Sequence, residues 1–196
     1  MELHGENGFF LNMFACPLSN KRNDQYGGNI NGRLLLIKNI VKEIQAFSDY
    51  KFIISYRMGW NDNLETDIQT AQALEQIGIE LIHVSLGIPF NRKVKLPGDL
   101  SYNDIVYTGT QVKKHIKIPL IAVNDIRTLI RGNVLIENNA CDFVAYGKPF
   151  LADEAYLSKS LDNYDFNSCF GCKNCQWFRN GKKCPAQIKA KGITYL

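Results

Sequence analysis

Two kinds of segment alternate along the chain. Short, nearly continuous apolar runs are typical of strands that are buried on both faces of a parallel sheet. Such runs occupy residues 51–58, 79–86, 119–123 and 142–146, and residues 1–4 read as the end of one more strand. Apolar residues spaced three or four positions apart are typical of amphipathic helices. That spacing occurs at residues 33–47, 66–77, 103–116 and 126–138.

This alternation predicts βα units joined by short connections, and therefore an α/β fold with a parallel sheet. Thr66-Asp67 reads as the start of the second helix and Gly78 as its end. Polar residues lie at or just beyond the ends of the predicted strands, namely His4, Arg57, Asn124 and Lys148. In a (β/α)8 barrel, polar groups at the strand ends lie together on one rim. The chain has the same layout but only about half of the βα units of a full barrel. We expect residues 1–160 to form this half-barrel and residues 161–196 to form a Cys-rich, basic tail.

The composition narrows the class of protein. A chain of 196 residues with 45% hydrophobic and 21% charged residues is ordinary for a globular domain. Apolar runs stay well below the roughly 20 residues that span a bilayer, and no signal-peptide pattern is present. We therefore expect a cytoplasmic protein that does not bind membranes. Residues 166–196 hold six basic residues and no acid, which favours a solvated surface over nucleic-acid binding. They are Lys173, Arg179, Lys182, Lys183, Lys189 and Lys191.

The residues after the first strand form a polar, Gly-punctuated stretch that we expect to be an ordered connection over the rim. It runs through His4-Gly5-Glu6-Asn7-Gly8, Pro17-Leu18-Ser19-Asn20, Arg22, Asp24, Tyr26-Gly27-Gly28 and Arg33. This string resembles the Old Yellow Enzyme family of FMN-dependent oxidoreductases, which is related to 2,4-dienoyl-CoA reductase. Arg57, Asn124 and Gly147-Lys148 follow in the family's order. The resemblance implies the second half of an FMN-binding TIM barrel, from the end of the fourth strand onward.

The resemblance also implies roles for individual residues. His4 and Asn7 match the pair that donates hydrogen bonds to the carbonyl or nitro oxygen of the acceptor. Arg57 matches the cation beneath the flavin pyrimidine edge, and Gly147-Lys148 match a Gly-Arg pair that binds the FMN phosphate. Lys148 keeps the positive charge but lacks the arginine fork. Asn124-Asp125 stand where the family commonly has Gly-Gly, so Asp125 has to point away from the phosphate.

Phe9 departs from the family pattern. Most relatives have a tyrosine here, whose hydroxyl donates the proton that completes alkene reduction. A phenylalanine has no such proton, so another acid or water has to supply it, or the natural reaction does not need one.

The tail carries four cysteines with metal-site spacing: Cys169-x2-Cys172-x2-Cys175-x8-Cys184-Pro185. In a cytoplasmic chain this spacing indicates metal rather than disulfides, and the short gaps favour a [4Fe-4S] cluster. It is similar to the cluster segment of 2,4-dienoyl-CoA reductase and trimethylamine dehydrogenase, although the last gap is shorter here. Zinc, or no metal at all, remains the alternative. We expect Cys16 and Cys141 to be buried apolar residues.

These observations leave two functional hypotheses. The first is an FMN oxidoreductase that passes hydride from NAD(P)H through flavin to an electron-poor alkene or similar small molecule. The second is a truncated or split, non-catalytic half-barrel that needs a partner chain. In either case unpaired strand edges and uncovered Val, Ile and Leu on the inner face favour association, with a missing N-terminal half-barrel or with a second copy.

Overall fold

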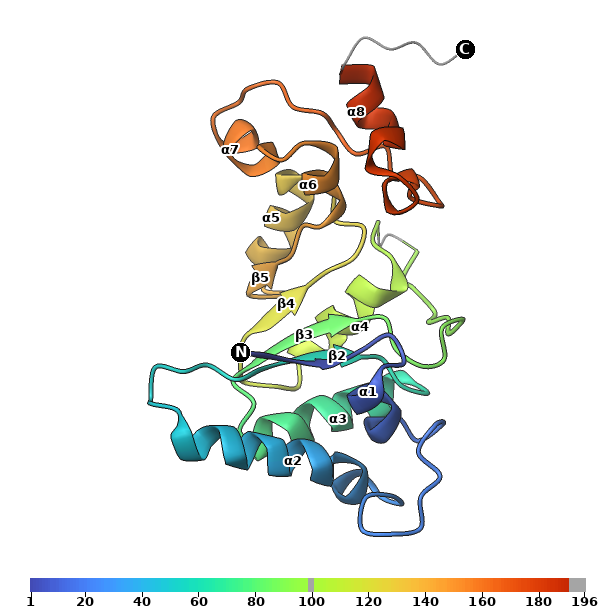
Figure 1. Cartoon of the computed structure of the whole chain (residues 1–196), viewed down its shortest axis with the longest axis vertical. Helices are drawn as coiled ribbons and strands as arrows, with labels where there is room; N and C mark the ends of the chain where they lie inside the picture. The colour runs from blue at the N-terminus through green and yellow to red at the C-terminus, as the bar shows by residue number, and fades with distance from the viewer. Residues whose placement is uncertain (99–100, 191–196) are drawn as a thin grey trace.

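A computed structural model describes residues 1–98 and 101–190; Lys191 of the predicted basic tail lies outside them. The fold is α/β, with one sheet in which every neighbouring pair of strands is parallel (Figure 1). Strand order follows the sequence: β1 (Glu2–Gly5), β2 (Ser55–Gly59), β3 (Leu81–Ser85), β4 (Leu120–Ala122) and β5 (Phe143–Val144). This order is the one that successive βα units produce in a barrel.

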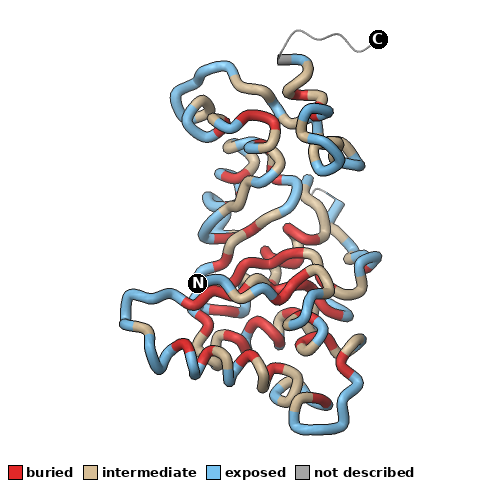
Figure 2. The backbone as a smooth tube through the Cα atoms, in the orientation of Figure 1, coloured by how far each residue is buried: buried red, intermediate tan, exposed pale blue. Residues whose placement is uncertain are grey.

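A helix follows each of the first four strands: α2 (Ile30–Phe47), α3 (Leu64–Ile77), α4 (Asp104–Lys113) and α5 (Leu129–Glu137). These helices pack on one face of the sheet and form the main apolar core with it (Figure 2). The sheet contributes alternate residues to this core, among them Tyr56, Met58, Ile82, Val84, Leu120 and Ala122. The order of elements is therefore as predicted, and most of the predicted boundaries are off by a few residues.

The start of α3 differs from the prediction. Asn63, not Thr66-Asp67, caps the helix, because its side chain accepts a hydrogen bond from the backbone N–H of Thr66 at 2.9 Å. Asp67 lies inside the helix and is fully buried. Gly78 ends the helix in the left-handed conformation, at φ 104°, as predicted.

The connection between β1 and α2 contains a short helix that was not predicted, α1 (Phe10–Ala15). The rest of the connection is fixed by side chains that bond to backbone carbonyls. Asn20 Nδ2 donates to the carbonyls of Phe14 and Tyr26, at 2.8 and 2.7 Å. Arg33 Nε donates to the carbonyl of Ala15 at 2.9 Å. The polar side chains Asn20 and Arg33 thus stabilise the backbone of this connection.

The second face of the sheet is more polar than expected. Strand register aligns His4, Arg57, His83, Ile121 and Phe143 in one row, on the face away from the helices. The expectation of uncovered Val, Ile and Leu here is largely wrong, because most of these aliphatic residues point toward the helices. Continuous apolar runs conceal which face each residue takes. Within the described residues β1 and β5 are the edges of the sheet.

After β5 come α6 (Lys148–Ala152), α7 (Tyr156–Leu161) and the cysteine-rich segment with α8 (Pro185–Ala190). Two 3-10 turns, η1 (Gln176–Phe178) and η2 (Gly181–Lys183), precede α8. Gln187 Nε2 donates to the carbonyl of Leu151 at 2.9 Å, and Ala152, Cys184 and Ala186 form a small second core. The cysteine-rich segment therefore packs against α6. The division at residue 160 stays a prediction. None of the described helices is both long and apolar enough to cross a bilayer.

Candidate functional site

One buried carboxylate links the end of β1 to the middle of β2, because Arg57 lies inside β2 and not at the strand end, where it was predicted. Glu6 is 1% exposed, and its Oε1 accepts a hydrogen bond from Asn7 Nδ2 at 3.0 Å. The same oxygen lies 3.0 Å from Arg57 Nε in an ion pair. Glu6 thus joins a predicted acceptor-binding residue to the predicted flavin-binding cation. Sequence reasoning missed Glu6, because a single acid in a polar string gives no sign that it is buried.

Arg57 is held from both sides of its strand. Its Nη2 donates to Ser85 Oγ on β3 at 3.4 Å, and its side chain remains 29% exposed. His83, the next residue in the same row, has Nδ1 3.1 Å from Glu2 Oε2, while Nε2 is buried with no partner among the described residues. Burial disfavours the imidazolium and lowers the pKa of His83. The row therefore places a permanent cation beside a histidine that tends to be neutral.

Aromatic rings flank His4 and Asn7. The imidazole of His4 is exposed, and its ring centroid lies 5.0 Å from that of Phe9, which is itself 57% exposed. On the other side, Phe90 lies so close to Gly8 that a Cβ atom there would come within 2.9 Å of Phe90 Cζ. Gly8 has φ +71°, so a side chain would also strain the backbone. One exposed aromatic ring thus lies beside His4 and another beside Gly8.

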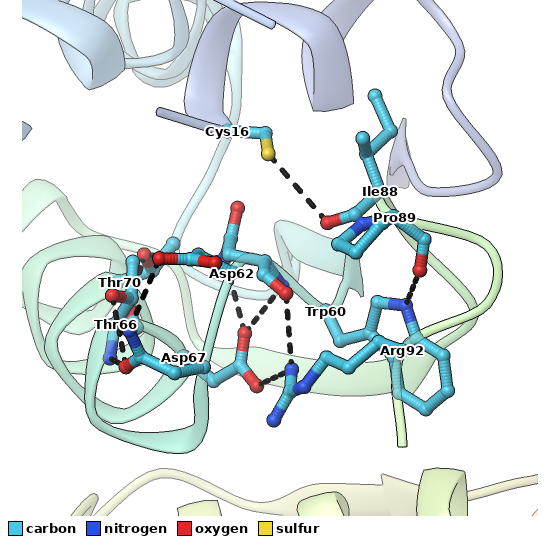
Figure 3. Close-up of polar contacts among 11 residues, drawn as sticks. Cys16, Trp60, Asp62, Thr66, Asp67, Thr70, Ile88, Pro89 and Arg92 are labelled. Carbon is cyan, nitrogen blue, oxygen red and sulfur yellow. Dashed lines mark hydrogen bonds and ion pairs between the residues drawn. The ribbon is translucent and has the colours of Figure 1, made fainter. Parts of the chain in front are cut away.

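A buried polar network fixes the loop that carries Phe90 (Figure 3). Asp67 on α3 pairs with Arg92, and both side chains are almost completely buried. Arg92 Nη1 also donates to the carbonyl of Asn61 at 3.2 Å, and its guanidinium lies over the Trp60 ring. Trp60 Nε1 in turn donates to the carbonyl of Pro89 at 3.0 Å. The loops after β2 and β3 are thus tied together, and neither Asp67 nor Arg92 was singled out for this from the sequence.

A cavity of about 150 Å³ opens at the carboxyl ends of β4 and β5. Its lining includes three of the predicted cofactor-binding residues, Asn124 and the pair Gly147-Lys148 that was assigned to the FMN phosphate. Asn124 and Asp125 adopt positive φ, 89° and 53°, and Asn124 Oδ1 accepts a hydrogen bond from Asn103 Nδ2 at 2.8 Å. Asp125 Oδ1 lies 3.1 Å from Arg127 Nε, which offsets the negative charge that would oppose an anion. Arg127 also lines the cavity and was missed from the sequence.

The four tail cysteines line a second, smaller cavity of about 20 Å³; they are Cys169, Cys172, Cys175 and Cys184. The backbone N–H of Gly171 donates to Cys169 Sγ at 3.5 Å. Within residues 1–98 and 101–190, however, no group of three or more His, Cys, Asp or Glu side chains is arranged to hold a metal ion. Cys16 and Cys141 are buried, as predicted, and burial raises the pKa of Cys141 to about 11. The spacing therefore brings four thiols to one place, and the metal stays a prediction.

The sequential parallel sheet and the polar rim define part of a (β/α)8 barrel. Residues 1–165 match the model of the NADH:flavin oxidoreductase / NADH oxidase family, and the chain belongs to that family. This confirms the resemblance to Old Yellow Enzyme.

Two curated relatives show how much of a family member the chain represents. It is 30% identical over 181 residues to an NADH oxidase of Thermoanaerobacter brockii, a match that covers 88% of this chain and 28% of the relative. It is also 30% identical over 162 residues to an NADPH dehydrogenase of Halalkalibacterium halodurans, covering 77% of this chain and 45% of that protein. The chain thus spans less than half the length of either relative.

Solved structures support the fold. A 2-naphthoyl-CoA reductase complex superimposes with a TM-score of 0.76 at 20% identity, covering 89% of this chain and 28% of that one. Morphinone reductase superimposes with a TM-score of 0.64 at 22% identity, covering 87% and 45%. These likenesses show a shared fold, of which this chain forms a part.

Proposed function

We propose that the chain forms the carboxyl-terminal part of an FMN-dependent NAD(P)H oxidoreductase of the Old Yellow Enzyme type, acting on an electron-poor alkene or similar small molecule. One observation carries this proposal: Glu6 Oε1 bonds Asn7 and pairs with Arg57, both at 3.0 Å. The groups assigned to acceptor and flavin therefore form one unit. The chain's membership of the family supports the same conclusion.

The residues present suit FMN. Lys148 and Arg127 line the cavity together with Asp125, whose carboxylate pairs with Arg127, so the three side chains leave one net positive charge for a phosphate. Bound FMN supplies hydride transfer, the chemistry that side chains lack. Arg57 is placed to stabilise negative charge, because it is always ionised and its ion pair with Glu6 fixes its orientation.

His4 and Asn7 would hold the acceptor. Both lie where β1 ends, and Asn7 keeps a second amide N–H beyond the one that bonds Glu6. Donors held in place before reaction stabilise the negative charge that develops on the acceptor oxygen. Phe9 lies beside His4 and Phe90 lies beside Gly8, so both offer apolar surface to an acceptor held by this pair.

The second candidate is a non-catalytic half-barrel that needs a partner chain. The sheet edges at β1 and β5 and the exposed Phe143, at 54%, favour it. Under this proposal the partner is the first half of such a barrel or a second copy of the chain. The flavin test below separates the two candidates.

We expect the chain, completed by the remaining part of the barrel, to quench FMN fluorescence on binding. Riboflavin should bind more weakly, because it lacks the phosphate that Lys148 and Arg127 would contact. Arg57→Ala should weaken the binding of both flavins about 10-fold or more, since hydrogen bonds to charged groups contribute about 1.5–3 kcal/mol. Arg22→Ala, which removes an exposed cation paired with Asp24, is the control. A completed barrel that binds no flavin supports the non-catalytic candidate.

The four tail cysteines hold a [4Fe-4S] cluster under the same proposal, with structural zinc as the alternative. Their common cavity and the N–H···S bond at Cys169 support this assignment. Anaerobically purified protein should contain iron and sulfide, which should be lost in Cys172→Ser and kept in Cys141→Ser. Zinc without sulfide identifies a structural site. Protein that contains neither iron nor zinc refutes the proposed metal site.

A further inference from the structure

Two neighbouring cavities meet at Lys148. The first is the anion cavity at the ends of β4 and β5, and the second is the cavity lined by the four cysteines. Lys148 lines both, because it begins α6, against which the cysteine-rich segment packs. A ligand in the first cavity would therefore lie close to the thiols of the second.

Arg127 makes a second and more specific connection. Its Nε pairs with Asp125 in the anion cavity at 3.1 Å. The other end of the guanidinium lies on Gly171, where an added Cβ atom would overlap Arg127 Nη1. Gly171 has φ +66°, which a residue with a side chain rarely adopts. One planar side chain thus contacts both the loop after β4 and the turn between Cys169 and Cys172.

The turn under Arg127 also positions a thiol. The N–H of Gly171 donates to Cys169 Sγ at 3.5 Å, so a shift of this turn displaces a cysteine. The far end of the segment is anchored separately, by the 2.9 Å bond from Gln187 Nε2 to the carbonyl of Leu151. Cys184 and Cys169 both pack at the small core with Ala152, and Arg127 is an additional contact to the turn that follows Cys169.

We propose that Arg127 is a positioning residue that couples the two cavities: an anion bound beside Asp125 and Lys148 fixes Arg127, and Arg127 fixes the turn that carries Cys169 and Cys172. The anion is a phosphate group, either that of FMN or free phosphate. The coupling is reciprocal, so a metal held by the cysteines strengthens anion binding. The inference rests on the anion cavity and cysteine site proposed above.

The test measures how fast uncharged iodoacetamide alkylates Cys169 and Cys172 in the metal-free, completed protein, read by mass spectrometry. FMN and inorganic phosphate should each slow alkylation about five-fold or more, the lower end of typical coupling between sites, and riboflavin should not. FMN should likewise tighten the binding of Zn²⁺, measured by chelator competition, by a similar factor. If only FMN slows alkylation, the anion is the phosphate of the flavin. If FMN and inorganic phosphate both slow it, the cavity is a general phosphate site.

Variants distinguish coupling through Arg127 from a direct effect of charge. In Arg127→Lys the cation remains but cannot contact Asp125 and Gly171 together, so FMN should still bind while protection of the cysteines is lost. Gly171→Ala should lose protection in the same way, and Arg179→Ala, an exposed cation of the same segment, should keep it. Protection that persists in Arg127→Lys overturns the inference. The inference is also overturned if FMN binds, as quenching of its fluorescence shows, but does not slow alkylation. That outcome leaves the proposed flavin binding intact. If neither FMN nor phosphate alters alkylation, the inference is wrong.

Discussion

Asp67→Ala is expected to lower the free energy of unfolding by about 3–5 kcal/mol, because it leaves the Arg92 guanidinium buried without its carboxylate. The loss extends beyond this pair, since Asp67 Oδ1 also accepts hydrogen bonds from the backbone and side chain of Asn61. Urea unfolding followed by circular dichroism measures the change.

The control for this experiment is Asp62→Ala, which removes an exposed carboxylate from the loop that precedes α3. Its effect should stay within about 0.5 kcal/mol. A double variant, Asp67→Ala with Arg92→Met, should be more stable than Asp67→Ala alone, because no unpaired charge remains buried. If the Asp67 and Asp62 variants had equal free energies of unfolding, water would have to solvate Arg92 when its carboxylate is removed.

Phe9→Tyr is expected to raise the rate of alkene reduction about 10²–10⁴-fold, the usual range for a positioned general acid. The ring already lies 5.0 Å from that of His4, beside the acceptor pair, and lacks only the hydroxyl. Flavin reduction by NAD(P)H should not change, because no proton from this face is needed in that half-reaction. Stopped-flow measurement of the two half-reactions, with an α,β-unsaturated ketone as acceptor, separates them.

Phe10→Tyr is the matched control, since Phe10 is 66% exposed on α1 and its ring packs on Phe14 rather than on His4. It should leave both half-reactions unchanged. If Phe9→Tyr also leaves alkene reduction unchanged, the proton comes from another group or from water, and Phe9 only forms a wall of the acceptor site.

The order of strands and helices was predictable, because each element leaves a periodic trace in the sequence. The boundaries of the elements were less predictable. Helix α3 is capped by Asn63 and not by Thr66-Asp67, and Asn, Thr and Asp can all cap a helix. Which residues of an apolar strand face the helices also could not be predicted, since a strand buried on both faces shows no alternation.

Some of the predicted site residues lie close together, while their roles stay predictions. Asn124, Gly147 and Lys148 line one cavity, and the four tail cysteines line another, as their positions after strands and their spacing indicated. The charges that hold the site together were missed: Glu6 beneath Arg57, Arg92 beside Asp67, and Arg127 on Gly171. Each joins residues far apart in the chain, and a sequence shows a charged residue without showing its partner.

The sequential strand order also bears on how the sheet is assembled. Among residues 1–98 and 101–190, neighbouring strands of the sheet are also neighbours in the chain, so each βα unit from β2 onward pairs with a strand that was synthesised before it. The sheet can therefore grow in the direction of synthesis on the ribosome, from β1 toward β5. The cysteine-rich segment follows α6 in the chain and packs onto it, so the segment is synthesised after the strands and the helix that line the anion cavity.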